Sequence, residues 1–254
     1  MAVHISAHEV ADARRQISVH DQPYILTDYI GAAPRRGQYV AGNERNDNGL
    51  PQGFLVDQPA GAVTQPHFHS HPQFQLVVDG SGRLGKHDVG FLDLHYVNGH
   101  TPYGPVAAGD DGLLYFTLRR YWDAGAKYMP ASRDLLVKGR QRTRYGGVPA
   151  TATRRLAEVG PADHITVIAL EADGLGAWLV QAGPGEAFSP PDPATGDGQY
   201  HVVVRGTAIH DAIELETLSC GFIEAADPAP VYRAGVDGAA LMICQFPRLE
   251  DMPV

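Results

Sequence analysis

The chain has 254 residues, with 29 acidic against 20 basic side chains and a formal net charge of -9. Hydrophobic residues make up 44% and charged residues 19%, as in ordinary globular proteins. The acidic balance argues against nucleic acid as a partner, because phosphate neutralisation needs a basic face. No apolar run is long enough to span a bilayer, so we expect no membrane partner.

Residues 1–49 contain no apolar stretch flanked by positive charge, so we expect no signal peptide and a cytoplasmic protein. We expect this segment to form strands or an arm that packs on the domains that follow. The two cysteines, Cys220 and Cys244, show no metal-binding or redox spacing. They are expected to be free thiols in a reducing compartment.

A first β domain is predicted over residues 50–120. The contents of glycine (29) and proline (19) favour short strands joined by tight turns over helices. Turns are expected at 80–82 and 109–112. The expected strands are 53–56, 65–69, 73–78, 83–86, 91–96 and 113–118.

The most informative segment of this domain places His67 and His69 one residue apart, Gln73 four residues later, and Gly61 and Gly80 at its ends. Side chains alternate between the faces of a strand, so His67 and His69 project to the same side. Two imidazoles and an oxygen donor from the next strand form a candidate site for a divalent first-row metal. The amide of Gln73 adds no charge to offset the metal, so binding should be weaker than with a carboxylate.

Further candidates follow in the same domain. His100 is our choice for a fourth ligand, with His95 as the alternative. Tyr103 and Gln75 are candidate catalytic residues, the first as a phenol donor and the second as a polar wall residue. Equally, Tyr103 could pack on the domain rim and Gln75 could be a hydrogen-bonded core residue. The arginines at 119 and 120 are expected to form a surface cluster, with pairing to a substrate carboxylate as the alternative.

The segment 121–163 carries the weakest strand pattern and is predicted to be a connector with short helices near 132–136 and 150–158. Beyond it, residues 164–254 repeat the first domain. The segment Gln73–Gly80 matches Gln199–Gly206 at an offset of 126 (199 − 73), and upstream positions match at an offset of 124. In the second copy Pro191 and Pro193 replace the two histidines and Ala226 replaces His100. We therefore expect a second domain without metal ligands.

The pattern Gly61-x5-His67-x-His69-x3-Gln73-x6-Gly80 resembles the first sequence motif of the cupin superfamily, in which glutamate usually stands at the position of Gln73. The region around His100 departs from the second cupin motif. With the repeat, the whole chain resembles a bicupin. This resemblance implies an all-β fold: two tandem jelly-roll barrels with a short, partly helical connector.

The resemblance also implies a function. It predicts one divalent first-row ion (Fe, Mn, Ni or Zn) held by His67, His69, Gln73 and His100, and a metal-dependent enzyme that acts on a small organic molecule in the first barrel. A dioxygenase-type oxidoreductase is the first prediction. The alternatives are a redox-neutral, metal-dependent lyase or isomerase and a non-catalytic bicupin that binds a small molecule. Two barrels in one chain favour a monomer or a homodimer.

Overall fold

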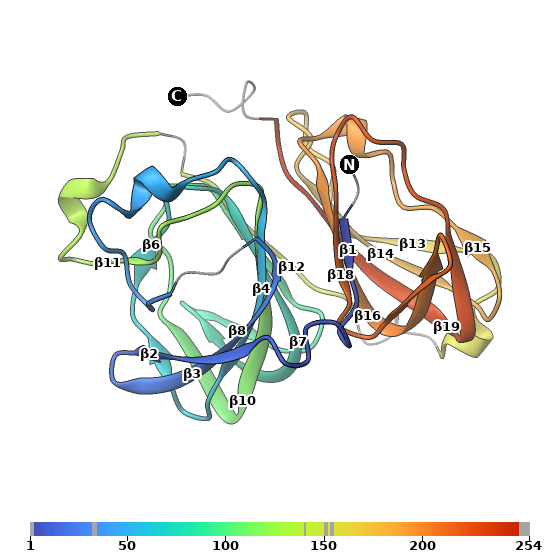
Figure 1. Cartoon of the computed structure of the whole chain (residues 1–254), viewed down its shortest axis with the longest axis horizontal. Helices are drawn as coiled ribbons and strands as arrows, with labels where there is room; N and C mark the ends of the chain where they lie inside the picture. The colour runs from blue at the N-terminus through green and yellow to red at the C-terminus, as the bar shows by residue number, and fades with distance from the viewer. Residues whose placement is uncertain (1–2, 32–34, 140, 150–151, 153–154, 249–254) are drawn as a thin grey trace. The chain divides into compact units, whose positions relative to one another are not determined.

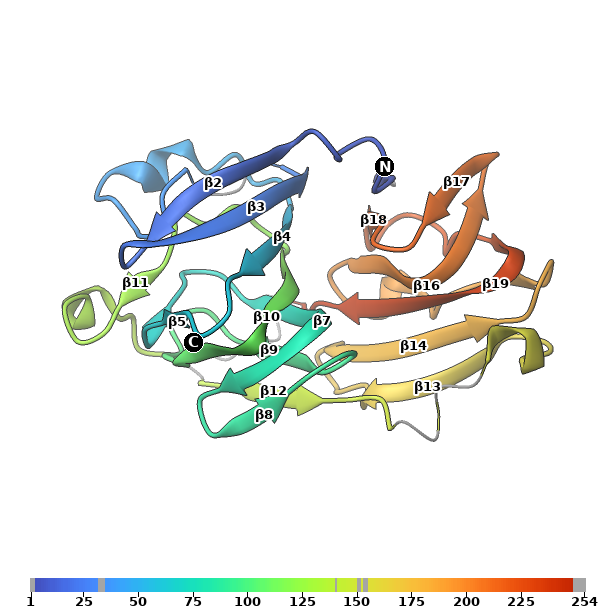
Figure 2. The same ribbon diagram turned by 90° about the horizontal axis from the view of Figure 1, so that it is seen from below.

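The computed structural model describes residues 3–31, 35–139, 141–149, 152 and 155–248. It is almost entirely β, as predicted, and it divides the chain into two compact units (Figures 1 and 2). We call residues 13–145 the first barrel, and residues 1–12 together with 146–252 the second barrel. In the described part of the chain, no helix is both long and apolar enough to cross a membrane.

The first barrel is built on one large antiparallel sheet. Its strands are β2 (Arg14–Val19), β3 (Gln22–Ile30), β4 (Gln52–Gln58), β7 (Gln73–Leu84), β9 (Leu94–Val97), β10 (Val106–Arg119) and β12 (Thr143–Gly146). They run in the order β12-β9-β7-β10-β4-β3-β2. Of the shorter strands, β5 (Val63–Thr64) pairs with β10 and β8 (His87–Val89) with β7, while β6 (His67–Phe68) pairs with β11 (Lys127–Tyr128).

The second barrel repeats this arrangement. Its strands are β1 (Val3–Ile5), β13 (Asp163–Ile168), β14 (Gly176–Ala182), β15 (Ala187–Phe188), β16 (Gln199–His210), β17 (Ile213–Glu216), β18 (Cys220–Ile223) and β19 (Tyr232–Gln245). The sheet order is β1-β18-β16-β19-β14-β13, with β15 on β19 and β17 on β16. Both cysteines are free and buried in this barrel.

The internal repeat seen in the sequence is a repeat of strands. The bounds of β7 and β10 return in β16 and β19 at an offset of 126, and those of β4 and β5 return in β14 and β15 at 124. The two-residue slip falls between β15 and β16, in a loop that contains the 3-10 turn Pro193–Thr195. The strand order β9-β7-β10-β4 of the first barrel therefore corresponds to β18-β16-β19-β14 of the second.

Two predicted turns are not turns. Residues 80–82 lie within β7 and residues 109–112 within β10. The predicted strand 83–86 is not separate, because its first two residues are the last two of β7. The glycines instead mark register shifts between the two long strands. Gly80 has a φ of 73°, and a Cβ atom there would lie 2.3 Å from the carbonyl oxygen of Gly112. Glycine therefore permits a close backbone approach inside the sheet rather than a reversal of the chain.

The structure also divides the chain at other places than the sequence analysis does. Strands β2 and β3 belong to the first barrel, whereas β1 pairs with β18 of the second. The predicted connector supplies β11 and β12 to the first barrel. Its expected helices are only the 3-10 turns Arg133–Leu135 and Leu156–Glu158. Part of the second expected helix, residues 150, 151, 153 and 154, lies outside the described residues.

Candidate functional site

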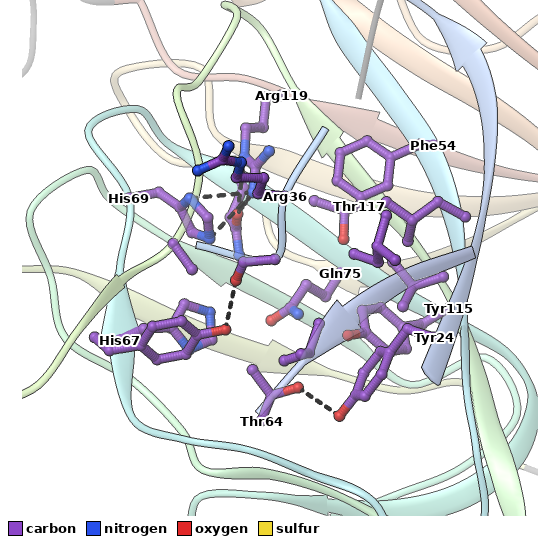
Figure 3. A pocket seen from close by; sticks show the side chains of 18 of the residues that line it. Tyr24, Arg36, Phe54, Thr64, His67, His69, Gln75, Tyr115, Thr117 and Arg119 are labelled. Carbon is purple, nitrogen blue, oxygen red and sulfur yellow. Dashed lines mark hydrogen bonds between the residues drawn. The ribbon is translucent and has the colours of Figure 1, made fainter. Parts of the chain in front are cut away.

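A cavity of about 80 Å³ lies inside the first barrel (Figure 3). One wall is apolar and comes from β2, β3 and β4, with side chains such as Val19, Leu26 and Phe54. The opposite wall is polar and comes mainly from β6, β7 and β10. Its side chains are His67, His69, Gln73, Gln75, Tyr103, Thr117 and Arg119. The predicted site residues of this segment, with one exception, therefore meet in one place.

The two histidines are held in the same tautomer. His67 donates its Nδ1 hydrogen to the Gln65 carbonyl oxygen at 2.7 Å, and His69 donates its Nδ1 hydrogen to Asp123 Oδ1 at 2.7 Å. Each ring therefore keeps the Nε2 lone pair on its other side. The ring centroids are 5.2 Å apart. Burial lowers the pKa of His67 to about 3 and that of His69 to about 4, so both imidazoles are neutral near pH 7.

Asp123 anchors the histidine loop from behind. Its carboxylate accepts the backbone N–H of Ser70 at 2.8 Å and that of Gly125 at 2.9 Å, in addition to the His69 hydrogen bond. Burial alone would raise the pKa of Asp123, but His69, Arg119 and Lys127 together hold it well below its usual range. Asp123 is therefore a buried anion that fixes the ring of His69.

Arg119 supplies the balancing cation. It stands directly opposite Gln73 in the β7–β10 register and is only 2% exposed, so the expected surface position is wrong for this arginine. Its Nε and Nη2 atoms donate to Gln73 Oε1 at 3.0 and 2.8 Å, and Nη1 donates to Gln52 Oε1 at 2.6 Å. Nη2 also lies 3.1 Å from His69 Nε2, the only acceptor left on that ring.

Tyr103, not His100, completes the group. Gln73 donates its Nε2 hydrogen to the Tyr103 hydroxyl oxygen at 2.5 Å. Backbone hydrogen bonds in both directions tie Tyr103 to His67, and their rings lie 4.5 Å apart. Because the phenol oxygen accepts from Gln73, its own hydrogen can point to another acceptor in the cavity. Burial raises the pKa of Tyr103, which keeps the phenol protonated.

The structure does not bring His100 or His95 into this group. His100 does not line the cavity, and its Nδ1 accepts the backbone N–H of Val137 at 3.2 Å. His100 follows the end of β9 at Val97 and has a left-handed backbone (φ 53°). His95 stands behind the cavity wall, where its Nδ1 donates to Gln75 Oε1 at 3.1 Å. Gln75 itself lines the cavity, as predicted from strand parity.

A resident divalent ion does not fit this donor set. An ion shared by His69 Nε2 and Gln73 Oε1 would need both atoms at about 2.0–2.2 Å, but the Arg119 guanidinium already lies between them. In the described part of the chain, no carboxylate lines the cavity to offset a second cation. Within the described ranges, no group of three His, Cys, Asp or Glu residues is arranged to hold a metal ion.

Comparison with known proteins supports the fold. No family model matches the sequence, and no curated protein matches it. Among solved structures, a "putative dioxygenase" from Nostoc punctiforme aligns with a TM-score of 0.60 at 10% identity, over 99% of this chain and 85% of that one. Pirin YhhW from Escherichia coli, in complex with nickel(II), aligns with a TM-score of 0.56 at 11% identity, over 98% and 100%.

Oxalate decarboxylase from Bacillus subtilis, studied for its Mn(II) centres, aligns with a TM-score of 0.54 at 14% identity, over 98% of this chain and 78% of that one. These neighbours are cupin-fold proteins. At such low identities the comparisons show that this chain has the cupin fold, and the metals are properties of the neighbours.

Two residues organise the site without having been predicted to do so: Arg119, which was expected at the surface with substrate pairing as the alternative, and Asp123, which was not predicted at all. A signal for Arg119 was present, because strand parity and the β7–β10 pairing place it opposite Gln73. Asp123 lies in a segment without strand pattern, and no local rule brings its carboxylate to His69. Long-range loop packing of this kind is not readable from one sequence.

Proposed function

We propose that the first barrel is the active site of a redox-neutral enzyme that moves a proton on a small carbonyl compound, without a resident metal. One observation carries this proposal: His67 and Tyr103 both line the cavity, with their ring centroids 4.5 Å apart. The hydrogen bonds of these two residues to Gln65 and Gln73 leave one acceptor, His67 Nε2, and one donor, the Tyr103 hydroxyl hydrogen, for a ligand. A base next to an oxygen-directed donor is the arrangement that enolisation requires.

The step itself balances without an oxidant. His67 Nε2 takes a proton from the carbon next to the substrate carbonyl, the C–H electron pair forms a carbon–carbon double bond, and the carbonyl π pair moves onto oxygen. Tyr103 stabilises that oxygen by hydrogen bonding. Return of the proton at a different carbon gives an isomerase, and departure of a leaving group from the neighbouring carbon gives a lyase.

Arg119 acts in this scheme through Gln73. Its positive charge polarises the Gln73 amide, which donates to Tyr103, so the phenol becomes a stronger donor towards the developing oxyanion. Charge develops only during the step: His67 becomes positive as it takes the proton, and the substrate oxygen beside Tyr103 becomes negative. The low pKa of His67 keeps the ring unprotonated near pH 7 and also makes it a weaker base, so the reaction depends on the stabilisation of the oxyanion by Tyr103.

A metal-dependent dioxygenase is the second candidate, and one observation favours it. Histidine ligands of metals usually donate their other ring N–H to a carboxylate or a carbonyl, as His67 and His69 do here. The fold shared with a "putative dioxygenase" adds to this. This function would require the Arg119 guanidinium to leave His69 and Gln73, and four hydrogen bonds hold it there.

One experiment separates the two candidates. Protein purified without chelator is incubated in D2O with cyclohexanone, hexan-2-one and 5-oxohexanoate, while NMR follows C–H exchange, an electrode follows dioxygen and mass spectrometry counts bound metals. We expect exchange next to the carbonyl, lost by about 100-fold or more in Tyr103→Phe and His67→Gln, with no dioxygen uptake. No exchange with any of the three, or dioxygen uptake with one metal per chain, would contradict the proposal.

A variant gives the matched control for metal. Arg119→Gln copies the second barrel, where Gln245 occupies the equivalent position. We expect wild-type protein to leave added Co²⁺ with the absorption spectrum of the free ion, and Arg119→Gln to bind about one ion through imidazole nitrogen. Binding of one Co²⁺ by the wild type at the same affinity as by Arg119→Gln would show that Arg119 does not exclude metal.

A further inference from the structure

Arg36 lies where the cavity meets solvent. It lines the cavity together with Tyr128 and Phe54, and it also lines a second hollow of about 210 Å³, called the outer hollow, together with Arg35 and Asn43. The side chain is exposed, unlike those of the polar wall. Arg36 is thus on the passage between solvent and the interior, and Figure 3 shows it among the side chains that surround the cavity.

The charge at this entrance is not balanced. Among the residues that the structure describes, two guanidinium groups and no carboxylate line the cavity. The charge of Arg119 is offset by Asp123, which lies behind His69 and interacts with both residues. Within the described ranges, no ion pair or hydrogen bond engages the Arg36 side chain, although the whole protein has a formal net charge of -9. A lone cation at the mouth of a cavity in an acidic protein attracts an anionic ligand.

We infer that the substrate is a small oxo acid, a carbonyl compound with one carboxylate, and that Arg36 binds the carboxylate while Tyr103 binds the carbonyl oxygen. The inference rests on the proposed function and adds the substrate class. A guanidinium group holds a carboxylate through two parallel hydrogen bonds, which also fixes its orientation. The carbon chain between the two groups lies on the apolar wall formed by β2, β3 and β4.

The opposite orientation, with the carboxylate at Arg119, is disfavoured by the hydrogen bonds already made there. The Nε, Nη1 and Nη2 atoms of Arg119 donate to Gln73, Gln52 and His69. A carboxylate at Arg119 would have to displace these bonds, whereas at Arg36 it meets a side chain without a partner in the described residues. Arg119 therefore acts on Gln73 and Tyr103, and Arg36 selects the ligand.

Calorimetric titration of the full chain tests this inference with matched probes. The probes are 2-, 4- and 5-oxohexanoate, which vary the spacing of the two groups, and the corresponding oxohexanamides, which keep the shape but lack the charge. We expect at least one acid to bind 10-fold or more tightly than its amide to the wild type. Arg36→Gln should abolish that preference and leave amide binding unchanged. Arg35→Gln, which alters only the outer hollow, should retain the preference.

The outcomes separate this inference from the proposed function. Acids that bind through Arg36 but show no C–H exchange would refute proton transfer and leave the carboxylate site standing. Equal exchange of acids and amides in wild type and in Arg36→Gln would support proton transfer and overturn the carboxylate site. Failure of all three acids to bind, or a preference that survives in Arg36→Gln, also overturns it. Because Arg36 is exposed, the preference should weaken with added salt.

Discussion

The two barrels pair equivalent strands but place different chemistry on them. In the first, Gln73 of β7 faces Arg119 of β10, and in the second, Gln199 of β16 faces Gln245 of β19. Gln199 donates its Nε2 hydrogen to Gln245 Oε1 at 2.7 Å, so this pair is a neutral hydrogen bond between amides. The fold therefore supplies a polar pair at this position, and the first barrel adds a charge to it.

A second difference concerns hydrogen bonds that remain to be made. His201 takes the place of Gln75, accepts from the Tyr232 hydroxyl at 2.8 Å and donates to Gln199 Oε1 at 2.8 Å. Tyr232 in turn accepts from His4 Nε2 at 2.8 Å. These four side chains of the second barrel satisfy one another, whereas His67 and Tyr103 of the first each direct one group to a cavity. The first barrel can bind a ligand because His67 and Tyr103 are held in place and each still has one hydrogen bond to make.

Each barrel contains one tryptophan, so their stabilities can be measured separately. Trp122 lies in the first barrel and Trp178 in the second. Fluorescence of a Trp178→Phe protein in urea reports on the first barrel, and that of a Trp122→Phe protein reports on the second. All the stability comparisons below use these two backgrounds.

The largest expected difference is in acid. Burial lowers the pKa of His67 and His95 to about 3 and that of His69 to about 4 in the first barrel. In the second barrel it lowers the pKa of His4 to about 4 and that of His201 well below its usual range. Below about pH 6.5 these histidines are protonated in the unfolded chain but stay neutral in the folded barrel. The free energy of unfolding therefore falls as the pH falls.

Each such histidine contributes about 1.4 kcal/mol of lost stability per pH unit between about pH 6.5 and its folded pKa. Burial also lowers the pKa of His71 and His100, so with five such histidines against two the first barrel should lose stability more steeply. Urea midpoints at about pH 7, 6 and 5 measure the two slopes. His67→Gln should reduce the slope of the first barrel alone. Equal slopes, or a steeper one in the second barrel, would contradict this ordering.

The next effect concerns the cross-strand pair. Arg119→Gln removes a buried cation that helps to lower the pKa of Asp123, and it breaks charged hydrogen bonds to Gln73, Gln52 and His69, at a cost of about 3 kcal/mol or more. Gln245→Leu in the second barrel breaks only neutral hydrogen bonds, at a cost of about 1–2 kcal/mol. Unfolding in urea should therefore show a larger loss for the first barrel. Equal losses would mean that the charge contributes nothing beyond the hydrogen bonds.

Much of the fold was predictable because it depends on local pattern and repetition. The alternation that placed His67, His69, Gln73 and Gln75 on one face is correct, since all four line the cavity. The offset of 126 correctly matched the long strands. These features depend on the two-residue alternation of strands and on an internal repeat, both of which a single sequence displays directly.

The rest depended on backbone geometry and on loops. Gly80 and Gly112 looked like turns, because local sequence does not distinguish a turn from a register shift inside a long strand. The fourth member of the site was assigned to His100, but a left-handed residue at that position carries Tyr103 inward instead. Arg36 becomes meaningful only when β2, β3 and the cavity are assembled around it.

A smaller effect should be equal in the two barrels. Gly80 and Gly206 have φ values of 73° and 71°, and an added Cβ would lie 2.3 and 2.1 Å from the carbonyl oxygens of Gly112 and Gly238. Alanine at either position should cost about 2 kcal/mol. Gly61→Ala, with a φ of 68° and open space around it, should cost about 1 kcal/mol. A loss in only one barrel would show that the glycine serves the site rather than the repeated fold.

The smallest stability effect should give the sharpest functional contrast. Tyr103→Phe removes the acceptor of the Gln73 amide, and Tyr232→Phe removes the donor to His201, so each should cost about 1 kcal/mol in its own barrel. Only Tyr103 faces the cavity with its hydroxyl, so only Tyr103→Phe should weaken binding of oxohexanoates and abolish C–H exchange. Titration calorimetry and exchange in D2O, run on both variants, measure this. If Tyr232→Phe lowered the rate of C–H exchange as much as Tyr103→Phe, exchange would depend on the stability of the whole protein. That result would contradict the proposal that the first barrel is the active site.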